Sequence, residues 1–322
     1  MRKKHLFLAV ATIPVLVGSA APPPCLAGPT CPQEHTDNRD NGSPQPLFRP
    51  NLALLKPKTR QEHEQAALRG PCFAHYQSRG RELVFIGTQH GTRLDSPSHQ
   101  LIEQVIDRFH PDCIVIEGSE TRMGWSHMGL LRDANRMVIR GACPEPLYAA
   151  SLAAQREIAF LGGEPAPFAT TEALRKLGSD SDALAWLVVR QLGQVRREQG
   201  LKQLDGRVQE LLPRMKRRFE LETKMSLADF KIWFQEQTGQ PLTADNLRLA
   251  RTAPLAGPAP TFFEKAAVEV MLAREKHLLD LQAKLLQNHE RVMVVYGNGH
   301  LVYELPVLSD MMGRPTRIDR QW

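Results

Sequence analysis

Several patterns are missing from this 322-residue chain, and each absence narrows what the protein can be. Its five cysteines form no Cys-x-x-Cys pair and no zinc-knuckle spacing, which argues against a redox motif or a cysteine-ligated zinc site. No internal repeat of short period is present. The most apolar stretch, residues 6–21, contains Pro14 and is shorter than the ~20 residues that a transmembrane helix needs. The remaining composition, 42% hydrophobic and 24% charged, is that of an ordinary soluble globular protein.

The chain also lacks a strong excess of charge. Its formal charge is +6, and half of this excess comes from the basic residues 2–4 in a segment that we expect to be removed. The remainder is too small to indicate nucleic acid or anionic lipid as a partner.

The first residues have the form of a secretory signal. A basic start (residues 2–4) precedes the apolar stretch 6–21, and small residues allow cleavage after Ala20 or Ala27. We therefore expect residues 1–27 to be a signal peptide and the mature protein to be secreted or periplasmic, without a stable membrane span. An uncut N-terminal anchor is the alternative.

Composition divides the rest of the chain. Residues 28–50 are rich in Pro, Gly, Asn and Asp, which predicts a disordered lead. Residues 51–322 are expected to form a single α/β domain, with a helical insertion at about 182–260. A first helix is expected from residues 52 to 67.

Apolar runs and turn residues predict the order of elements. A hairpin around residues 78–80 is followed by alternating helices and buried strands, which is typical of an α/β fold with a central, mostly parallel sheet flanked by helices. The strand–helix–strand order after the hairpin predicts a crossover to a parallel neighbour. The expected strands are 72–76, 82–86, 113–116, 158–161, 292–296 and 316–318, and the expected helices are 96–109, 146–156, 262–287 and 301–312, with 182–237 mostly helical.

Cysteine placement leaves one question open. Cys113 lies inside an apolar strand, so we expect a buried free thiol. In an oxidising compartment Cys72 could be bridged to Cys143, or Cys31 to either of them.

Two apolar runs end in the same motif. Gly-x-x-His occurs at residues 87–90 and again at 297–300, each time directly after a predicted strand. Because α/β sheets place ligands at the carboxyl ends of their strands, we expect His90 and His300 to meet at one edge of the sheet. The alternative is two ordinary loop histidines.

Two acids follow the other predicted strands in the same way. Glu117 comes after four apolar residues, where an unpaired buried carboxylate would be costly, so it is expected to face a site or a cation. Glu164 follows two glycines and could equally be a loop acid. Arg274 on the long helix is a candidate charge partner for either acid, and a solvated helix pair is the alternative.

This set of groups predicts hydrolytic chemistry. His90, His300, Glu117 and Glu164 together are a ligand set for a divalent transition metal with one position left for water. Such a metal would make hydroxide near neutral pH, and a carboxylate outside the ligand set would act as general base. In a metal-free alternative, one histidine is the base and the acids orient it.

The same residues resemble a known family. Segments 87–90, 111–117 and 294–300, with Gly163-Glu164 and Arg274-Glu275, resemble the TraB/GumN/Tiki family and the wider erythromycin-esterase-like and ChaN-like superfamily. The resemblance spans about residues 72–315. It implies an α/β core with both motif histidines and a strand-end glutamate at one site.

The resemblance also implies an activity. The Tiki branch implies a metal-dependent protease, using manganese or cobalt, that acts on extracellular peptides. The resulting hypothesis is a secreted hydrolase, most simply a peptidase, with manganese, cobalt or zinc bound by His90, Glu117, Glu164 and His300. Glu117, Glu164 and Arg274 are its expected catalytic residues, and a peptide or small molecule its substrate. The ChaN-like relatives imply an alternative, a non-catalytic protein that binds haem or a peptide.

Overall fold

The computed structural model describes residues 47–66, 70–120, 126–199, 203–320 and 322. The expected signal peptide and most of the expected lead lie outside these residues. No helix in the described part of the chain is long and apolar enough to cross a membrane.

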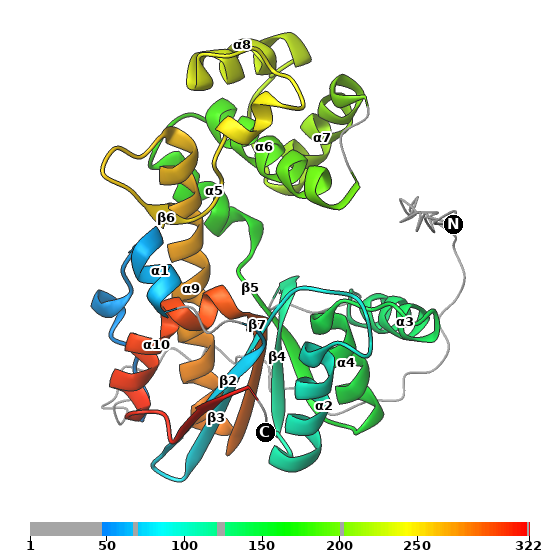
Figure 1. Ribbon diagram of the computed structural model, residues 1–322, viewed down its shortest axis with the longest axis vertical. Coiled ribbons are helices and arrows are strands. Elements are labelled where there is room, and N and C mark those ends of the chain that lie inside the picture. Colours follow the sequence, from blue (N-terminus) through cyan, green and yellow to red (C-terminus); the bar gives the residue numbers. More distant parts are fainter. Residues whose placement is uncertain (1–46, 67–69, 121–125, 200–202, 321) are drawn as a thin grey trace, which may run out of the picture.

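A six-stranded sheet forms the centre of the protein, in the order β5-β4-β7-β3-β2-β8 (Figure 1). Strands β5, β4, β7 and β3 run parallel, whereas β2 and β8 pair antiparallel at one side. This arrangement confirms the predicted α/β fold with a mostly parallel sheet. The strands are β2 (Cys72–Ser78), β3 (Arg81–Thr88), β4 (Cys113–Glu120), β5 (Ala159–Glu164), β7 (Arg291–Gly297) and β8 (Arg317–Asp319).

Strand β7 lies between β3 and β4, so the predicted pairing of β3 with its successor β4 is wrong. Alternate residues of β7 pack into two different cores: Val294 and Tyr296 belong to one, and Met293 and Val295 to the other. A strand that is apolar on both faces is suited to the middle of a covered sheet. Its position puts this late strand between β4, which carries Glu117, and β3, which is followed by His90.

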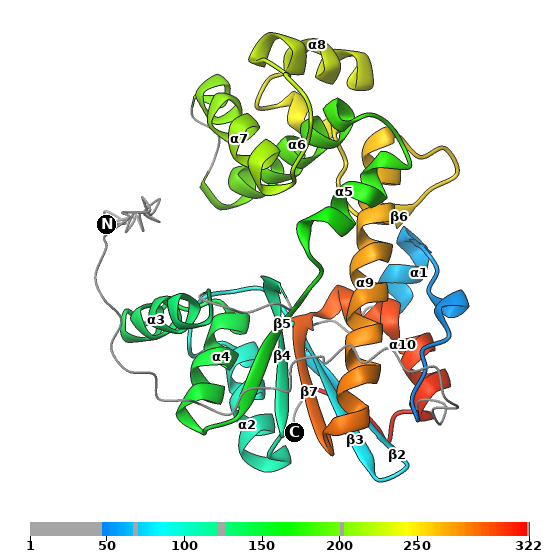
Figure 2. The same ribbon diagram turned by 180° about the vertical axis from the view of Figure 1, so that it is seen from behind.

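Helices cover both faces of the sheet, as the views from the front and from behind show (Figures 1 and 2). One face carries α2 (Pro97–Phe109), α3 (Ser126–Ile139) and α4 (Glu145–Gln155), and the other carries α9 (Phe262–Asn288) and α10 (Asn298–Met312). Helix α3 was not predicted. Helix α10 begins at Asn298 rather than at Leu301, so His300 lies in the first turn of a helix and not in a loop.

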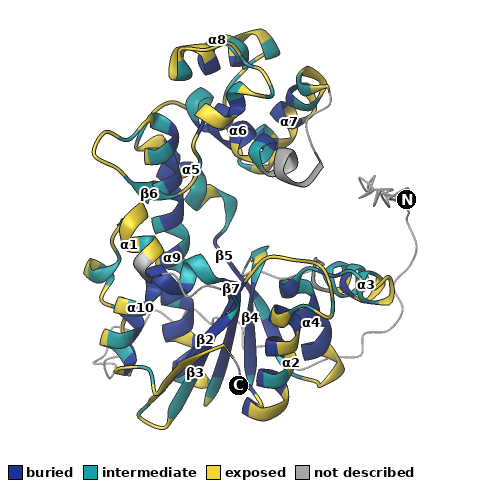
Figure 3. Ribbon diagram, viewed as in Figure 1, coloured by how far each residue is buried: buried dark blue, intermediate teal, exposed yellow. Residues whose placement is uncertain are grey.

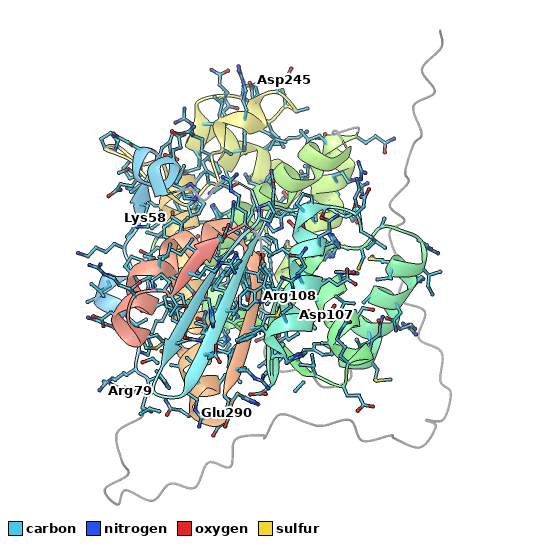
Figure 4. All side chains as sticks on the ribbon, turned by 60° about the horizontal axis from the view of Figure 1, so that its bottom comes forward. Lys58, Arg79, Asp107, Arg108, Asp245 and Glu290 are labelled. Carbon is cyan, nitrogen blue, oxygen red and sulfur yellow. The ribbon has the colours of Figure 1, made fainter. Side chains whose placement is uncertain are left out.

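The predicted hairpin is confirmed at β2 and β3. Arg79 and Gly80 connect the two strands with φ angles of 51° and 73°. Positive φ at both central residues is the signature of a type I′ turn, whose twist matches that of the flanking strands. Arg79 is labelled at this turn in Figure 4, at the end of the sheet where Glu290 precedes β7.

The first described residues depart from the expected pattern. The single helix predicted from 52 to 67 is wrong, because η1 (Leu52–Leu54), β1 (Lys58–Thr59) and α1 (Arg60–Ala66) occupy that stretch. Pro57 stands between the first two, where it lacks an N–H to continue a helix. Strand β1 pairs in parallel with β6 (Leu255–Ala256), which lies within the expected helical insertion.

The end of the expected disordered lead is packed on the body. Phe48 is 2% exposed and belongs to the core beside α9. The main-chain N–H of Leu47 donates to Gln287 Oε1 at 3.0 Å, and Gln287 Nε2 donates back to the Phe48 carbonyl at 3.2 Å. The packed chain therefore includes residues 47–50.

A helical part stands beyond the carboxyl ends of the strands and has a core of its own (Figure 3). Its helices are α5 (Pro167–Arg175), α6 (Asp180–Gln199), α7 (Leu204–Arg218) and α8 (Leu227–Thr238), with the short η2 (Asn246–Leu249). Trp186 is buried in this core, and its Nε1–H donates to the Phe263 carbonyl at 3.1 Å. This core takes residues from α5 and from the start of α9, so it extends beyond 182–260 on both sides.

Helix α9 connects this helical part to the sheet. Its beginning, capped by Thr261 and Glu264, packs in the helical core through Phe263 and Val270, and its second half packs on the sheet through Leu278 and Leu286. Arg274 and Glu275 lie between the two apolar stretches. Figure 2 shows α9 running past the ends of β5 and β7.

The three cysteines in the described ranges are buried thiols that form no disulfide with one another. The expected burial of Cys113 is confirmed. A bridge between Cys72 and Cys143 is not formed, because Cys72 packs in the core on one face of the sheet and Cys143 in the core on the other.

Candidate active site

The two Gly-x-x-His segments lie side by side because β3 and β7 are neighbours. In their register Gly87 faces Tyr296 and Thr88 faces Gly297. A Cβ added at Gly87 would lie 2.9 Å from Asn298 Cα, and one added at Gly297 would lie 3.0 Å from His90 Nε2. Each motif's glycine therefore leaves room for a residue of the other motif.

Glu117 lies on β4 directly after Ile116, the last residue of β4 that pairs with β7, and it is the point where the two segments meet. Its Oε2 accepts from the Gly297 N–H at 2.8 Å, and its Oε1 lies 3.3 Å from Arg274 Nη2 and 3.4 Å from His300 Nε2. Burial opposes ionisation of this side chain. The hydrogen bond and charge of His300, with the charges of Arg274 and His90, nevertheless hold the pKa of Glu117 well below its ordinary value.

Arg274 binds the second strand-end acid more closely. Its Nε donates to Glu164 Oε2 at 2.8 Å and its Nη2 to Glu164 Oε1 at 2.5 Å. The Gly118 N–H donates to the same Oε1 at 3.3 Å. Burial would raise the pKa of Glu164, but the guanidinium charge outweighs it and the pKa is lowered. The arginine therefore links β4, β5 and α9.

His300 is fixed from both of its ring nitrogens. Its Nδ1 is hydrogen-bonded to Oε1 of Glu275, which is fully buried, while Nε2 faces Glu117. Burial lowers the pKa of His300, but the Glu275 carboxylate and the hydrogen bond to Glu117 raise it to about 10 despite the nearby Arg274. The imidazole is therefore protonated near neutral pH.

His90 differs from His300 because it is exposed to solvent. It borders an open pocket of about 230 Å³ between the end of β3 and the start of α2. Polar groups of this pocket include Thr92, Ser96 and Ser98. The site thus has one solvent-facing imidazole and one enclosed imidazole on either side of Glu117.

Two further acids of this region were missed as site residues. Glu275 was noted only as part of the Arg-Glu pair, and Glu304 on α10 was not noted; both are fully buried. A signal for each was present in the sequence: Glu275 lies on the face of α9 that also carries Leu278 and Leu279, and Glu304 follows Leu301 on α10. An acid on the apolar face of a helix needs a partner inside the protein.

A third missed acid is Glu145, at the start of α4. It is 1% exposed, and a Cβ added at Gly91 in the pocket beside His90 would lie 3.8 Å from its Oε1. Burial raises its pKa, against lowering by its own main-chain N–H and by the charges of His90 and His99. The sequence around it, Pro144-Glu145-Pro146, gives no sign of this environment.

The expected metal ligands are close together but do not form a metal-binding set in this arrangement. In the described part of the chain, no group of three or more His, Cys, Asp or Glu side chains is arranged to hold a metal ion. Arg274 bonds both oxygens of Glu164, and Glu117 is engaged by Gly297, Arg274 and His300. The guanidinium supplies the positive charge that a metal would bring to these carboxylates. Metal binding by the four residues stays a prediction.

Comparison of the chain with protein-family models, curated proteins and solved structures finds no match. Membership of the TraB/GumN/Tiki family therefore stays a prediction that depends on the short motifs. What the chain can do has to be argued from the geometry of its own residues.

Proposed function

We propose that this protein is a hydrolase of peptides or small-molecule esters, with Glu117 at the centre of its site. One observation supports this most directly: Gly297, Arg274 and His300 all face the Glu117 carboxylate, beside the exposed imidazole of His90. An ionised acid fixed in this way between two imidazoles is suited to proton transfer and charge stabilisation.

His90 is the proposed general base. A neutral imidazole accepts a proton from water near neutral pH, and water can reach His90 through the open pocket. The ionised Glu117 would stabilise the imidazolium that forms. Gly297 contributes by leaving space for the His90 ring.

His300 is the proposed stabiliser of negative charge on the substrate. Because Glu275 bonds its Nδ1, its Nε2–H is held toward Glu117, where it can also donate to a neighbouring substrate oxygen that becomes negative during attack by water. Arg274 adds positive charge, and Glu164 holds Arg274 in place.

The resemblance predicts a requirement for manganese or cobalt, and zinc is a further candidate for the same ligands. The described geometry favours the metal-free form of this chemistry. Metal binding through Glu117 and Glu164 would require both acids to leave Arg274. Export to the periplasm or medium also stays a prediction.

The test is hydrolysis of a panel of peptides and esters by the purified chain, with and without a chelator. Under the proposal, turnover survives chelation and falls by roughly 10²- to 10⁴-fold in His90→Asn. His110→Asn is the matched control, because His110 is an exposed histidine with a left-handed φ of 50° that asparagine also adopts.

The other possible outcomes each support a different function for the protein. Loss of turnover on chelation, restored by manganese, cobalt or zinc, would establish the metal-dependent hydrolase instead. Absence of turnover across the panel, with haem or a peptide bound by wild type and not by Glu117→Gln, would refute the hydrolase and favour the binding protein.

A further inference from the structure

A line of buried polar side chains continues behind the proposed site, between α9 and α10. It passes from His300 to Glu275 and on to Glu304 and Gln282. Glu275, Gln282 and Glu304 are all 0% exposed. Gln282 Nε2 donates to Glu304 Oε2 at 2.6 Å. These groups lie within the apolar core that packs the two helices on the sheet.

Two carboxylate oxygens of this line, Glu275 Oε2 and Glu304 Oε1, have no hydrogen-bond donor among the described residues, and the amide oxygen of Gln282 has none either. The two carboxyl groups are nevertheless within hydrogen-bonding reach of each other. Two ionised carboxylates so close in an apolar core would repel, and each oxygen without a donor would add a desolvation penalty. A single proton between the two groups removes the repulsion and satisfies both oxygens.

We propose that Glu304 is a positioning residue of the site: as a neutral carboxylic acid it donates from Oε1 to Oε2 of Glu275, and so holds Glu275 against His300. The positioning role rests on the proposed hydrolytic function, whereas the shared proton does not. Gln282 determines which oxygen carries the proton, because its amide N–H already occupies Glu304 Oε2.

The surroundings of Glu304 agree with the neutral form. Burial and the charge of Glu275 raise the pKa of Glu304 well above its ordinary value, against the opposing effects of Gln282 and His300. The phenol of Tyr76 on β2, which is itself buried, also interacts with the Glu304 carboxyl group. If Glu304 were ionised, its repulsion would push Glu275 away from the imidazole and leave Nδ1 of His300 without its acceptor.

The proton can be detected without any substrate. In the infrared spectrum of the full chain at pH 7, we expect the C=O stretch of a protonated carboxylic acid, which Glu304→Gln removes. Glu145→Gln is the control, because burial also raises the pKa of Glu145, and it should leave the Glu304 contribution in place. If no variant at position 304 changes the carboxylic acid band, the proposal is wrong.

Positioning is tested with a conservative and a disruptive variant. Glu304→Gln keeps an N–H donor toward Glu275, so the downfield ¹H NMR signal of the His300 Nδ1 proton should persist and turnover should be retained. Glu304→Leu removes the donor, so this signal should broaden or shift and kcat should fall by roughly 10- to 100-fold with little change in KM. Equal loss in both variants would overturn the positioning role.

Two results separate this inference from the proposed function. An infrared band that depends on Glu304, in a protein that hydrolyses nothing, would support the shared proton and refute the hydrolase. Should Glu304→Leu fail to fold, the infrared and NMR comparison of wild type with Glu304→Gln still decides, because loss of the Nδ1 signal in Glu304→Gln would contradict the donor role.

Discussion

Arg274 on α9 and Glu164 on β5 form a two-point ion pair across 110 positions of sequence, with bonds of 2.8 and 2.5 Å. Both side chains are 17% exposed. The paired geometry is possible because a planar guanidinium matches a carboxylate, which an ammonium does not. This ion pair joins the helix that carries Glu275 to the end of the sheet.

The Arg274–Glu164 pair should therefore contribute much more to the free energy of unfolding than a surface ion pair does. Removing one partner leaves a buried charge, so Arg274→Gln should lower the free energy of unfolding by about 3–5 kcal/mol. Arg274→Lys should be intermediate, since lysine cannot make both bonds. Denaturant unfolding measures this, with Lys176→Gln as control for the exposed pair with Glu269, expected to cost at most about 1 kcal/mol. If all three variants lost a similar free energy of unfolding, the Arg274–Glu164 pair would contribute no more to stability than the exposed Lys176–Glu269 pair.

The two motif histidines should respond differently to the same substitution. His90→Asn should abolish most turnover yet change the free energy of unfolding by less than about 0.5 kcal/mol, because His90 is exposed. His300→Asn should lower both turnover and the free energy of unfolding, because it leaves the buried Glu275 without its hydrogen bond to Nδ1 of His300. Thermal unfolding and activity, measured on both variants, check this. Equal destabilisation would show that His90 has a structural role instead.

Gly297 should tolerate no side chain. In Gly297→Ala the new Cβ would lie 3.0 Å from His90 Nε2, so the ring must move and turnover should fall while the fold persists. Gly299→Ala is the matched control, because the nearest atom to its Cβ is His63 Nε2 at 3.7 Å. Steady-state kinetics of both variants test this. The close approach is irrelevant to function if Gly297→Ala is as active as Gly299→Ala.

The helical part should lose stability in acid through Asp182. Burial would raise its pKa, but bonds from Ser179 and from Trp233 Nε1 (2.8 Å) lower it. A lowered pKa in the folded state means that the stabilisation is complete above the ordinary Asp value of about 4 and is lost as pH falls further. Denaturant unfolding followed by tryptophan fluorescence should show wild type and Asp182→Asn converging as pH falls. If the free energies of unfolding of wild type and Asp182→Asn differed by a constant amount over this pH range, Asp182 would not be the group responsible for the loss of stability.

The buried thiols should be unreactive in the folded protein. Burial raises the pKa of Cys72 to about 11 and of Cys143 to about 12, so very little thiolate forms at pH 8. Mass spectrometry of peptides that contain these residues should show slow alkylation of the native chain and fast alkylation in denaturant. Rapid labelling of Cys72 in native conditions would indicate that β2 opens.

Much of the fold follows from local sequence signals. The apolar runs predicted the strands of the sheet, the Arg79-Gly80 pair marked the hairpin, and α2 begins where Ser96 caps it. Glu117 was identified because it directly follows an apolar run, and Glu164 because it follows a predicted strand after two glycines. These features depend on residues within a few positions of one another, so a pattern in the sequence suffices to predict them.

Other features depend on contacts between distant segments, and only the tertiary structure decided them. The late strand β7 enters between β3 and β4, and this insertion alone puts His300 beside Glu117. The sequence leaves open whether Arg274 is a solvated helix residue or a buried partner of two acids. Strand order and helix packing are set by which apolar faces cover one another across the whole chain, and that choice is a property of the folded core.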